Sequence, residues 1–298
     1  MNNIKTVFSI KDLENLTGIK AHTIRIWEKR YTILEPVRTE TNIRLYNIEN
    51  LQKLLNVQLL NNHGYKISTI SKLAEDTIPQ LVNDIISDKS VKHHAVSSFK
   101  LAMMNFDQAL FLNTYEKLLS EKSFREIFMD ILVPFLHETG FLWQTNTISV
   151  AHEHFISYLV KQKLHINTEK LQYKPTSKKD KVFVLYLPKS EIHELGLMYL
   201  NYEILLSGYK TIYLGENVPI SSLNDVKKYF DNITYVCYMT VEPNRSVVNE
   251  YIKEINKKVL TDDSNFWITG RMVENIRTDL ITERTTVFND FKAIVATL

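Results

Sequence analysis

Residues 181–196 are the most informative stretch of this chain, with the sequence Lys-Val-Phe-Val-Leu-Tyr-Leu-Pro-Lys-Ser-Glu-Ile-His-Glu-Leu-Gly. The continuous apolar run at its start is typical of a strand that is buried on both faces of a parallel sheet. Open α/β sheets bind ligands beyond the carboxyl ends of their strands, and Glu191, His193 and Gly196 follow the predicted strand at that place. We therefore expect a ligand site in this loop, at the start of the next helix.

The pairing of Glu191 with His193 favours metal binding by the imidazole. A carboxylate two residues away can accept one ring N–H, which fixes the tautomer and makes the other ring nitrogen a better metal donor. Gly196 has no side chain, so it allows a bulky ligand to approach the following helix closely. The alternative is a plain hydrogen bond between two surface side chains.

Downstream of this stretch, apolar runs and helical segments alternate. The predicted strands are 182–187, 210–214, 234–239, 266–268 and 285–288, and the predicted helices are 195–206, 222–229, 245–257 and 291–296. Strands that alternate with crossover helices imply a doubly wound parallel sheet. No Gly-x-Gly-x-x-Gly follows the first strand, which disfavours nucleotide binding.

Upstream of it lie a charged linker, predicted at 168–181, and a helical region at 79–170. Amphipathic segments of helix length predict a four-helix bundle there. They are 96–104, 106–119, 123–140 and 148–163.

Length and composition indicate a globular protein with two or three cores, since 44% of the 298 residues are hydrophobic and 23% are charged. The single cysteine, Cys237, lies in an apolar run, which predicts a buried thiol in a reducing compartment. No apolar run reaches the roughly 18 residues that a membrane span needs, and no signal peptide is apparent. We expect a cytoplasmic location and no membrane partner.

The positive charge is concentrated at the amino end. Through Glu75 the chain has 11 Lys or Arg and 7 Asp or Glu, a net charge of +4, against +2 for the whole chain. Such an excess is compatible with nucleic-acid binding but does not establish it.

The amino-terminal pattern is that of a helix-turn-helix. Ser9 can cap a helix at 10–16, Thr17-Gly18 interrupts it, and a second helix is predicted at 22–31. The second helix carries polar and basic residues beside apolar ones, so one side can pack while the other contacts DNA. An extended stretch that follows is typical of a wing, and helices at 48–63 and 67–75 complete the domain.

These residues together resemble the DNA-binding domain of MerR-type transcriptional regulators over residues 7 to about 75. The motifs that carry the resemblance are Phe8-Ser-Ile-Lys-Asp-Leu, Thr17-Gly-Ile, Thr23-Ile-Arg-Ile-Trp-Glu-Lys-Arg-Tyr, Arg38 and Ile43-Arg-Leu-Tyr46. The resemblance implies major-groove contacts for Thr23, Arg25 and Arg30, and backbone or wing contacts for Arg38, Arg44 and Tyr46. Trp27 either packs under the wing or donates its indole N–H to a phosphate.

Two further motifs resemble those of cobalamin-dependent regulators. Trp143 is followed by Glu153-His154 at the spacing of a Trp-x9-Glu-His signature, and Glu191-x-His193-x-x-Gly196 matches Asp-x-His-x-x-Gly with Glu for Asp. The resemblance implies adenosylcobalamin or methylcobalamin as cofactor, a helical bundle over the upper face of the corrin, and His193 as the cobalt ligand. The residues implied to bind the cofactor are Trp143, Glu153, His154, Glu191, His193, Gly196, Thr240 and Gly270.

Three motifs of the family are not matched by this chain. Cobalamin domains have Ser-x-Leu and Gly-Gly motifs along the groove for the nucleotide tail of the cofactor, and this chain has Tyr238-Met-Thr240 and Thr269-Gly270. The tail pocket is therefore expected to be narrower, or the cofactor to be lost. The light-sensing members have a histidine after the tryptophan, where this chain has Gln144, and an amide is a poor cobalt donor.

The sequence therefore predicts a multidomain α and α/β protein that is a transcriptional regulator and not an enzyme. We expect a winged helix-turn-helix domain at 1–76, a helical-bundle cobalamin cap at 77–176 and a Rossmann-like cobalamin-binding domain at 177–298. The expected partners are a double-stranded operator, a second copy in a dimer or tetramer, and RNA polymerase. Two alternatives are a regulator whose B12-like domain is cofactor-free and serves oligomerisation, and a cobalamin-dependent enzyme or corrinoid carrier.

Overall fold

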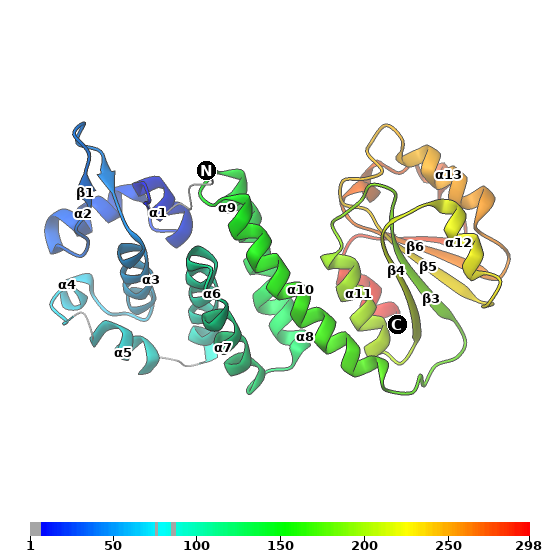
Figure 1. The fold of residues 1–298 in the computed structure, drawn as a ribbon, viewed down its shortest axis with the longest axis horizontal. Helices are drawn as coiled ribbons and strands as arrows, with labels where there is room; N and C mark the ends of the chain where they lie inside the picture. Colours follow the sequence, from blue (N-terminus) through cyan, green and yellow to red (C-terminus); the bar gives the residue numbers. More distant parts are fainter. Residues whose placement is uncertain (1–6, 75–76, 85–87) are drawn as a thin grey trace. The chain divides into compact units, whose positions relative to one another are not determined.

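The computed structural model describes residues 7–74, 77–84 and 88–298. The chain divides into two compact units, with the boundary between Val160 and Lys161 inside helix α10 (Figure 1). The structure divides into two units where the sequence predicts three domains. The domain boundaries predicted from the sequence therefore stay a prediction.

The first unit begins with the helix-turn-helix, α1 (Ile10–Thr17) and α2 (Ala21–Tyr31). Ser9 caps α1 in a capping box, because its hydroxyl accepts the N–H of Asp12 over 3.1 Å while the Asp12 carboxylate accepts the N–H of Ser9 over 2.7 Å. Gly18 ends α1 with φ +75°, a conformation that favours glycine. The predicted helix-turn-helix is confirmed.

An antiparallel ribbon forms the wing, from β1 (Val37–Arg38) and β2 (Arg44–Leu45). The following helices are α3 (Ile48–Asn62), α4 (Ile67–Ile70) and α5 (Thr77–Asp84). The helix predicted at 67–75 is shorter than expected, and position 75 lies outside the described residues.

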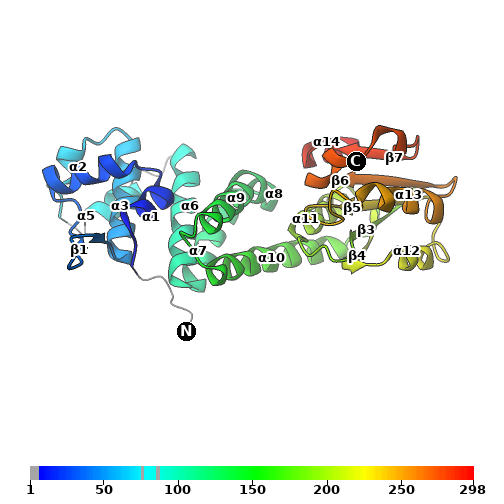
Figure 2. The same ribbon diagram turned by 90° about the horizontal axis from the view of Figure 1, so that it is seen from above.

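The same unit continues into a helical bundle. Its elements are α6 (Asp88–Asn105), α7 (Gln108–Leu119), α8 (Phe124–Ile127), the π-helical turn η1 (Phe128–Leu132), α9 (Val133–Gln144) and the first part of α10 (Val150–Gln172). Figures 1 and 2 show α6 and α7 side by side, and the rings of Phe99 and Phe111 on these helices are 4.9 Å apart. Because Pro134 at the start of α9 has no N–H to donate, it accounts for the irregular hydrogen bonding of η1.

Helix α10 corrects one prediction. The charged linker was expected from residue 168, but α10 continues to Gln172. The residues at 169–172 are Glu, Lys, Leu and Gln, all good helix formers, so their charge did not end the helix.

The second unit is a three-layer α/β domain. Its strands are β3 (Val182–Pro188), β4 (Lys210–Val218), β5 (Ile233–Tyr238), β6 (Ser264–Thr269) and β7 (Thr285–Phe288). They are all parallel, in the order β4-β3-β5-β6-β7, which confirms the predicted sheet.

Helices cover both faces of this sheet, as Figure 1 shows for α11 on one side and α12 and α13 on the other. The helices are α11 (Leu195–Leu206), α12 (Ile220–Val226), α13 (Val248–Lys258) and α14 (Phe291–Thr297), with short 3₁₀ turns η2 (Arg271–Asn275) and η3 (Thr278–Leu280). Alternate residues of β3 point to opposite layers, so that Val184 packs in one core and Phe183 in the other. Cys237 is buried as predicted. Among the described residues, no helix is long and apolar enough to cross a membrane.

The strand order reverses between β3 and β5, because the chain adds β4 on one side of β3 and β5 on the other. In open α/β sheets the crevice at such a reversal is the usual ligand site. The loops after β3 and β5 therefore require the closest inspection.

Candidate nucleic-acid interface and ligand loop

Helix α2 presents its basic residues to solvent. Arg25 and Arg30 are exposed, while Ile24 on the opposite side is fully buried. Thr23 and Trp27 are half-buried. This arrangement agrees with the amphipathic pattern and leaves two guanidinium groups available for a polyanion.

Glu28 holds the wing against α2, a role that the sequence did not reveal. Its carboxylate oxygens accept the Nε–H of Arg44 over 2.9 and 3.1 Å and the hydroxyl of Tyr46 over 3.0 Å. Arg38 Nη2 lies 3.6 Å from the same carboxylate. The only available signal was one acidic residue inside the basic run Trp-Glu-Lys-Arg.

Tyr46 is a correction to the expected set of DNA contacts. Its side chain is 1% exposed, and burial together with the hydrogen bond to Glu28 raises the pKa of its hydroxyl. A buried phenol that donates inward supports the wing and does not face a phosphate. Arg44 is partly buried by its pairing, whereas Arg38 remains 42% exposed.

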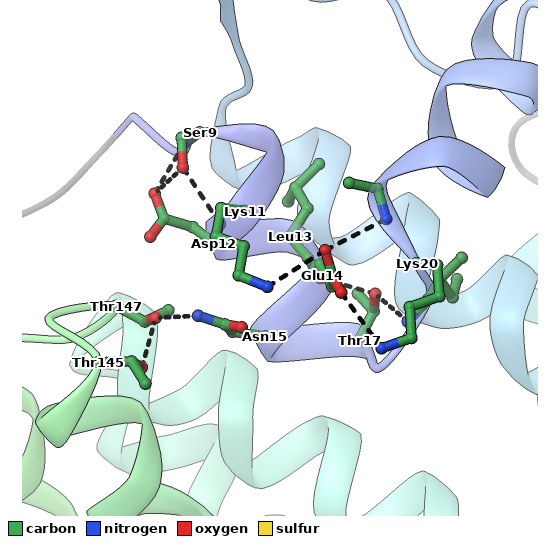
Figure 3. Close-up of polar contacts among 12 residues, drawn as sticks. Ser9, Lys11, Asp12, Leu13, Glu14, Asn15, Thr17, Lys20, Thr145 and Thr147 are labelled. Carbon is green, nitrogen blue, oxygen red and sulfur yellow. Dashed lines mark hydrogen bonds and ion pairs between the residues drawn. The ribbon is translucent and has the colours of Figure 1, made fainter.

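Helix α1 is tied to the helical bundle within the first unit. Asn15 Nδ2 donates to Thr147 Oγ1 over 2.9 Å, in the loop between α9 and α10 (Figure 3). Lys100 Nζ on α6 donates to the carbonyl of Leu16 over 2.8 Å and lies 2.6 Å from Glu138 Oε1 on α9. Because Lys100 is only 7% exposed, its ammonium group depends on these two partners for solvation.

The loop after β3 is organised by the buried carboxylate of Glu191. Oε1 accepts the Nδ1–H of His193 over 2.5 Å and the backbone N–H of Ile192 and His193. Oε2 accepts the backbone N–H groups of Thr240, Val241 and Glu242, which follow β5, over 2.6 to 3.0 Å. One side chain thus fixes both loops at the reversal of strand order.

The electrostatics of this carboxylate follow from its donors. Burial alone would raise the pKa of Glu191, but the N–H groups of Val241, Glu242 and His193 and the His193 ring lower it to about 2. The carboxylate is therefore ionised at neutral pH. Because it accepts a hydrogen bond from Nδ1, a neutral His193 ring carries its proton on Nδ1.

His193 consequently offers Nε2 as a ligand atom. Its side chain is 53% exposed, and no hydrogen bond to Nε2 occurs within the described residues. Ile192 and Val241, whose backbone N–H groups also bind the Glu191 carboxylate, are 63% and 50% exposed. No group of three or more His, Cys, Asp or Glu side chains that would hold a metal ion lies in the described ranges. A single imidazole suits a metal whose other ligands come from its own macrocycle.

The bundle residues of the predicted site lie at the end of α9 and the start of α10. Trp143 is 48% exposed, and Phe141 and Val150 near it are also exposed. His154 is 3.5 Å from Glu153 Oε2, and Glu153 Oε1 accepts the hydroxyl of Ser157 over 2.6 Å. His152 is instead buried and stacks on Phe106.

The remaining predicted residues, Gly196, Thr240 and Gly270, have structural roles inside the α/β unit. A Cβ at Gly196 would lie 2.5 Å from the ring of Tyr238, and a Cβ at Gly270 would lie 2.4 Å from the carbonyl oxygen of Met239. Both glycines are thus required by the chain's own atoms. Thr240 contributes its N–H to Glu191, and its buried Oγ1 has no hydrogen-bond partner in the described part of the chain.

Known families match both of these regions. Residues 8–77 match the MerR HTH family regulatory protein model, and residues 96–166 match a B12 binding domain. The chain combines a MerR-type helix-turn-helix domain with a B12-binding domain. The second match falls on the helical bundle that carries Trp143 and Glu153.

Two repressors of Myxococcus xanthus are homologous to this chain over most of its length. The chain is 26% identical over 226 residues to the HTH-type transcriptional repressor CarH, covering 72% of this chain and 73% of CarH. It is 25% identical over 219 residues to the HTH-type transcriptional repressor CarA, covering 72% of this chain and 70% of CarA.

A solved structure shares the fold. The Methanosarcina barkeri monomethylamine corrinoid protein superposes with a TM-score of 0.57 and 13% identity, covering 71% of this chain and 97% of that protein.

Proposed function

We propose that this protein is a transcriptional regulator without enzymatic activity, whose affinity for operator DNA responds to bound cobalamin. The observation that carries the proposal is the Glu191-held His193 in a chain whose other end presents Arg25 and Arg30 on a helix-turn-helix. A ligand site can act directly on transcription when the same molecule binds DNA, and the matches to a MerR-type domain and a B12 binding domain in one chain support this proposal.

On the DNA side, Arg25 and Arg30 contact base edges in the major groove, with Thr23 beside them. Arg38 neutralises a phosphate, and Arg44 shapes the wing through Glu28. Trp27 packs between α2 and the wing or donates to a phosphate. Tyr46 is withdrawn from the DNA contacts because it is buried.

On the cofactor side, the residues of the loop fit a corrinoid. His193 Nε2 would hold cobalt from below, with Glu191 orienting the ring, and the exposed Ile192 and Val241 would contact the edge of the corrin. Trp143, Glu153 and His154 contribute from the bundle. Bound adenosylcobalamin or methylcobalamin supplies a cobalt–carbon bond that light can break.

Gln144 limits how this chain could respond to light. Gln144 and the exposed His154 are the polar groups beside Trp143 and Glu153, and an amide does not replace imidazole as a cobalt donor. His152 is held in the core by Ser149 and Phe106. His154 would then be the exposed imidazole of this part of the bundle, and we expect the bundle not to hold an illuminated cofactor stably.

The proposed partners are double-stranded operator DNA, a second copy of the chain and RNA polymerase at the promoter. A symmetric dimer or tetramer matches a palindromic operator.

The DNA assignment is tested by gel shifts with Arg25→Ala, Arg30→Ala and Arg38→Ala. Each of the first two should weaken specific binding by about 1–3 kcal/mol, because each removes a base contact. Arg38→Ala should weaken binding to all sequences alike and reduce the salt slope by about one unit.

The control is Lys228→Ala, which removes an exposed positive charge from the α/β unit. Operator affinity that is unchanged in both Arg25→Ala and Arg30→Ala would contradict the assignment of α2 to the groove. A purified protein that shows no corrin absorbance after addition of adenosylcobalamin would leave the cofactor-free oligomerisation alternative. Substrate turnover without DNA binding would instead favour the enzyme or carrier alternative.

A further inference from the structure

Tyr238 fills the space between the first turn of α11 and the end of β5. Its ring atoms would lie 2.5 to 2.9 Å from a Cβ at Gly196, so helix and ring are in the closest contact that glycine permits. On its other side the ring stacks on Phe291 of α14, with the centroids 5.8 Å apart and the planes 12° apart. Tyr238 thus joins β5, α11 and α14 in one aromatic layer.

The adjacent position is closed by backbone. Gly270, at the end of β6, lies against Met239 with no room for a side chain. The N–H of Met239 donates to the carbonyl of Thr269 over 2.9 Å, and the N–H of Met272 donates to the carbonyl of Met239 over 3.0 Å. These bonds hold the ends of β5 and β6 together directly below the loop that carries Glu191.

The surroundings of Tyr238 and Gly270 are closed, whereas the surroundings of His193 are open. His193 is 53% exposed, and Ile192 and Val241 are exposed beside it. A flat macrocycle can therefore reach the imidazole from outside. The nucleotide tail of a complete cobalamin is bulky, and the Tyr238 ring leaves no room for it beside the first turn of α11.

We propose that the α/β domain binds corrinoids through the ring and His193 alone, and that the nucleotide tail stays outside its core. The inference rests on the proposed cofactor function and narrows it to a ligand class: corrinoids irrespective of their lower nucleotide. In complete cobalamin the tail base competes with His193 for the lower face of cobalt, whereas a corrinoid without the tail has no such competitor. Tyr238 is the residue that sets this specificity.

The experiment compares aquocobalamin with diaquocobinamide, which lacks the nucleotide, in spectroscopic titrations of the full chain. The wild-type protein should bind cobinamide at least as tightly as cobalamin. Tyr238→Ser should shift the ratio of the two affinities toward cobalamin by about tenfold, because it opens space beside Gly196. Tyr229→Ser is the matched control, since Tyr229 is 77% exposed in the same unit, and it should leave the ratio unchanged.

The wild-type comparison keeps the inference testable even if Tyr238→Ser fails to fold. Cobalamin binding that is more than about tenfold tighter than cobinamide binding would overturn it, because the tail would then contribute to affinity. His193→Ala should weaken both corrinoids and change the spectrum of each, and unchanged spectra would also overturn the proposal. If neither corrinoid binds the wild-type protein, the proposed cofactor function itself fails.

Discussion

At the scale of single residues, the carboxylate of Glu191 joins two loops. Oε1 accepts N–H groups on the His193 side, and Oε2 accepts backbone N–H groups after β5. Its side chain is 1% exposed, so it relies entirely on these N–H donors. The imidazole is therefore oriented before any ligand arrives.

Glu191→Gln should lower the stability of the α/β unit in a pH-dependent way. The pKa of Glu191 is about 2 in the folded protein and about 4.3 when unfolded, so the ionised carboxylate contributes stability above pH 4.3 that is lost as the pH falls toward 2. A shift of this size corresponds to about 3 kcal/mol at pH 7. Urea denaturation of wild type and variant at pH 7 and pH 3.5 measures the difference, which should shrink at the lower pH. A constant difference at both pH values would show that the carboxylate charge is not what the loops require.

At the scale of elements, Lys100 connects the DNA-binding helices with the bundle. It lies 84 positions from Leu16 in the chain, yet its ammonium group donates to the last turn of α1 and pairs with α9. The carbonyls at a helix C-terminus carry partial negative charge and attract a cation. Figure 3 shows the contact of Asn15 with Thr147, and together with it Lys100 fixes how α1 lies on the bundle.

Lys100→Met should destabilise the first unit by about 1–3 kcal/mol, because it leaves the Leu16 carbonyl and Glu138 without their donor. Hydrogen exchange at α1 should become faster, since the helix loses an anchor. The matched control is Lys117→Met, which removes an exposed lysine from the neighbouring helix α7 and should change neither quantity. Unaltered exchange at α1 in Lys100→Met would mean that apolar packing alone holds this contact.

Helices and strands could be predicted from signals in neighbouring residues, whereas contacts between distant residues could not be predicted. Ser9 with Asp12 marks the start of α1, and the apolar run at 182–187 marks β3, because capping and burial leave periodic patterns in neighbouring residues. The Glu28 network joins residues up to 18 positions apart. Nothing local distinguishes a buried Tyr46 from an exposed one. The sequence predicts a narrower pocket at Tyr238, but the contact of its ring with Gly196 appears only in the folded chain.

At the scale of the whole molecule, α10 is the element that both units share. Its first turns carry Glu153 and His154. Farther along the helix, Lys161 pairs over 3.0 Å with Glu194, which follows His193 in the chain. A ligand shifts an assembly only by binding one state of the protein more tightly than another.

We expect adenosylcobalamin to promote a larger, operator-binding assembly in the dark, and Trp143→Ala to weaken this response, because it removes an exposed aromatic from the proposed corrin site. Size-exclusion chromatography and gel shifts, in the dark and after illumination, with and without the cofactor, measure both effects. Tyr173→Ala serves as the control, because Tyr173 is 82% exposed and lies beyond the end of α10. Identical elution and identical shifts in all conditions would rule out cobalamin sensing and leave a constitutive DNA-binding oligomer.

The π-helical turn η1 determines in which direction the side chains of the following helix, α9, point. A single π turn accommodates about one residue more than the α-helical path, and each residue of an α-helix advances the side-chain direction by about 100°. Glu138 and Trp143 both lie after this turn, whereas Phe124 lies before it. If the same residues formed a regular α-helix instead, every side chain after the turn would be rotated by about 100°. The indole of Trp143 and the carboxylate of Glu138, which pairs with Lys100, therefore each owe their direction to one irregular turn.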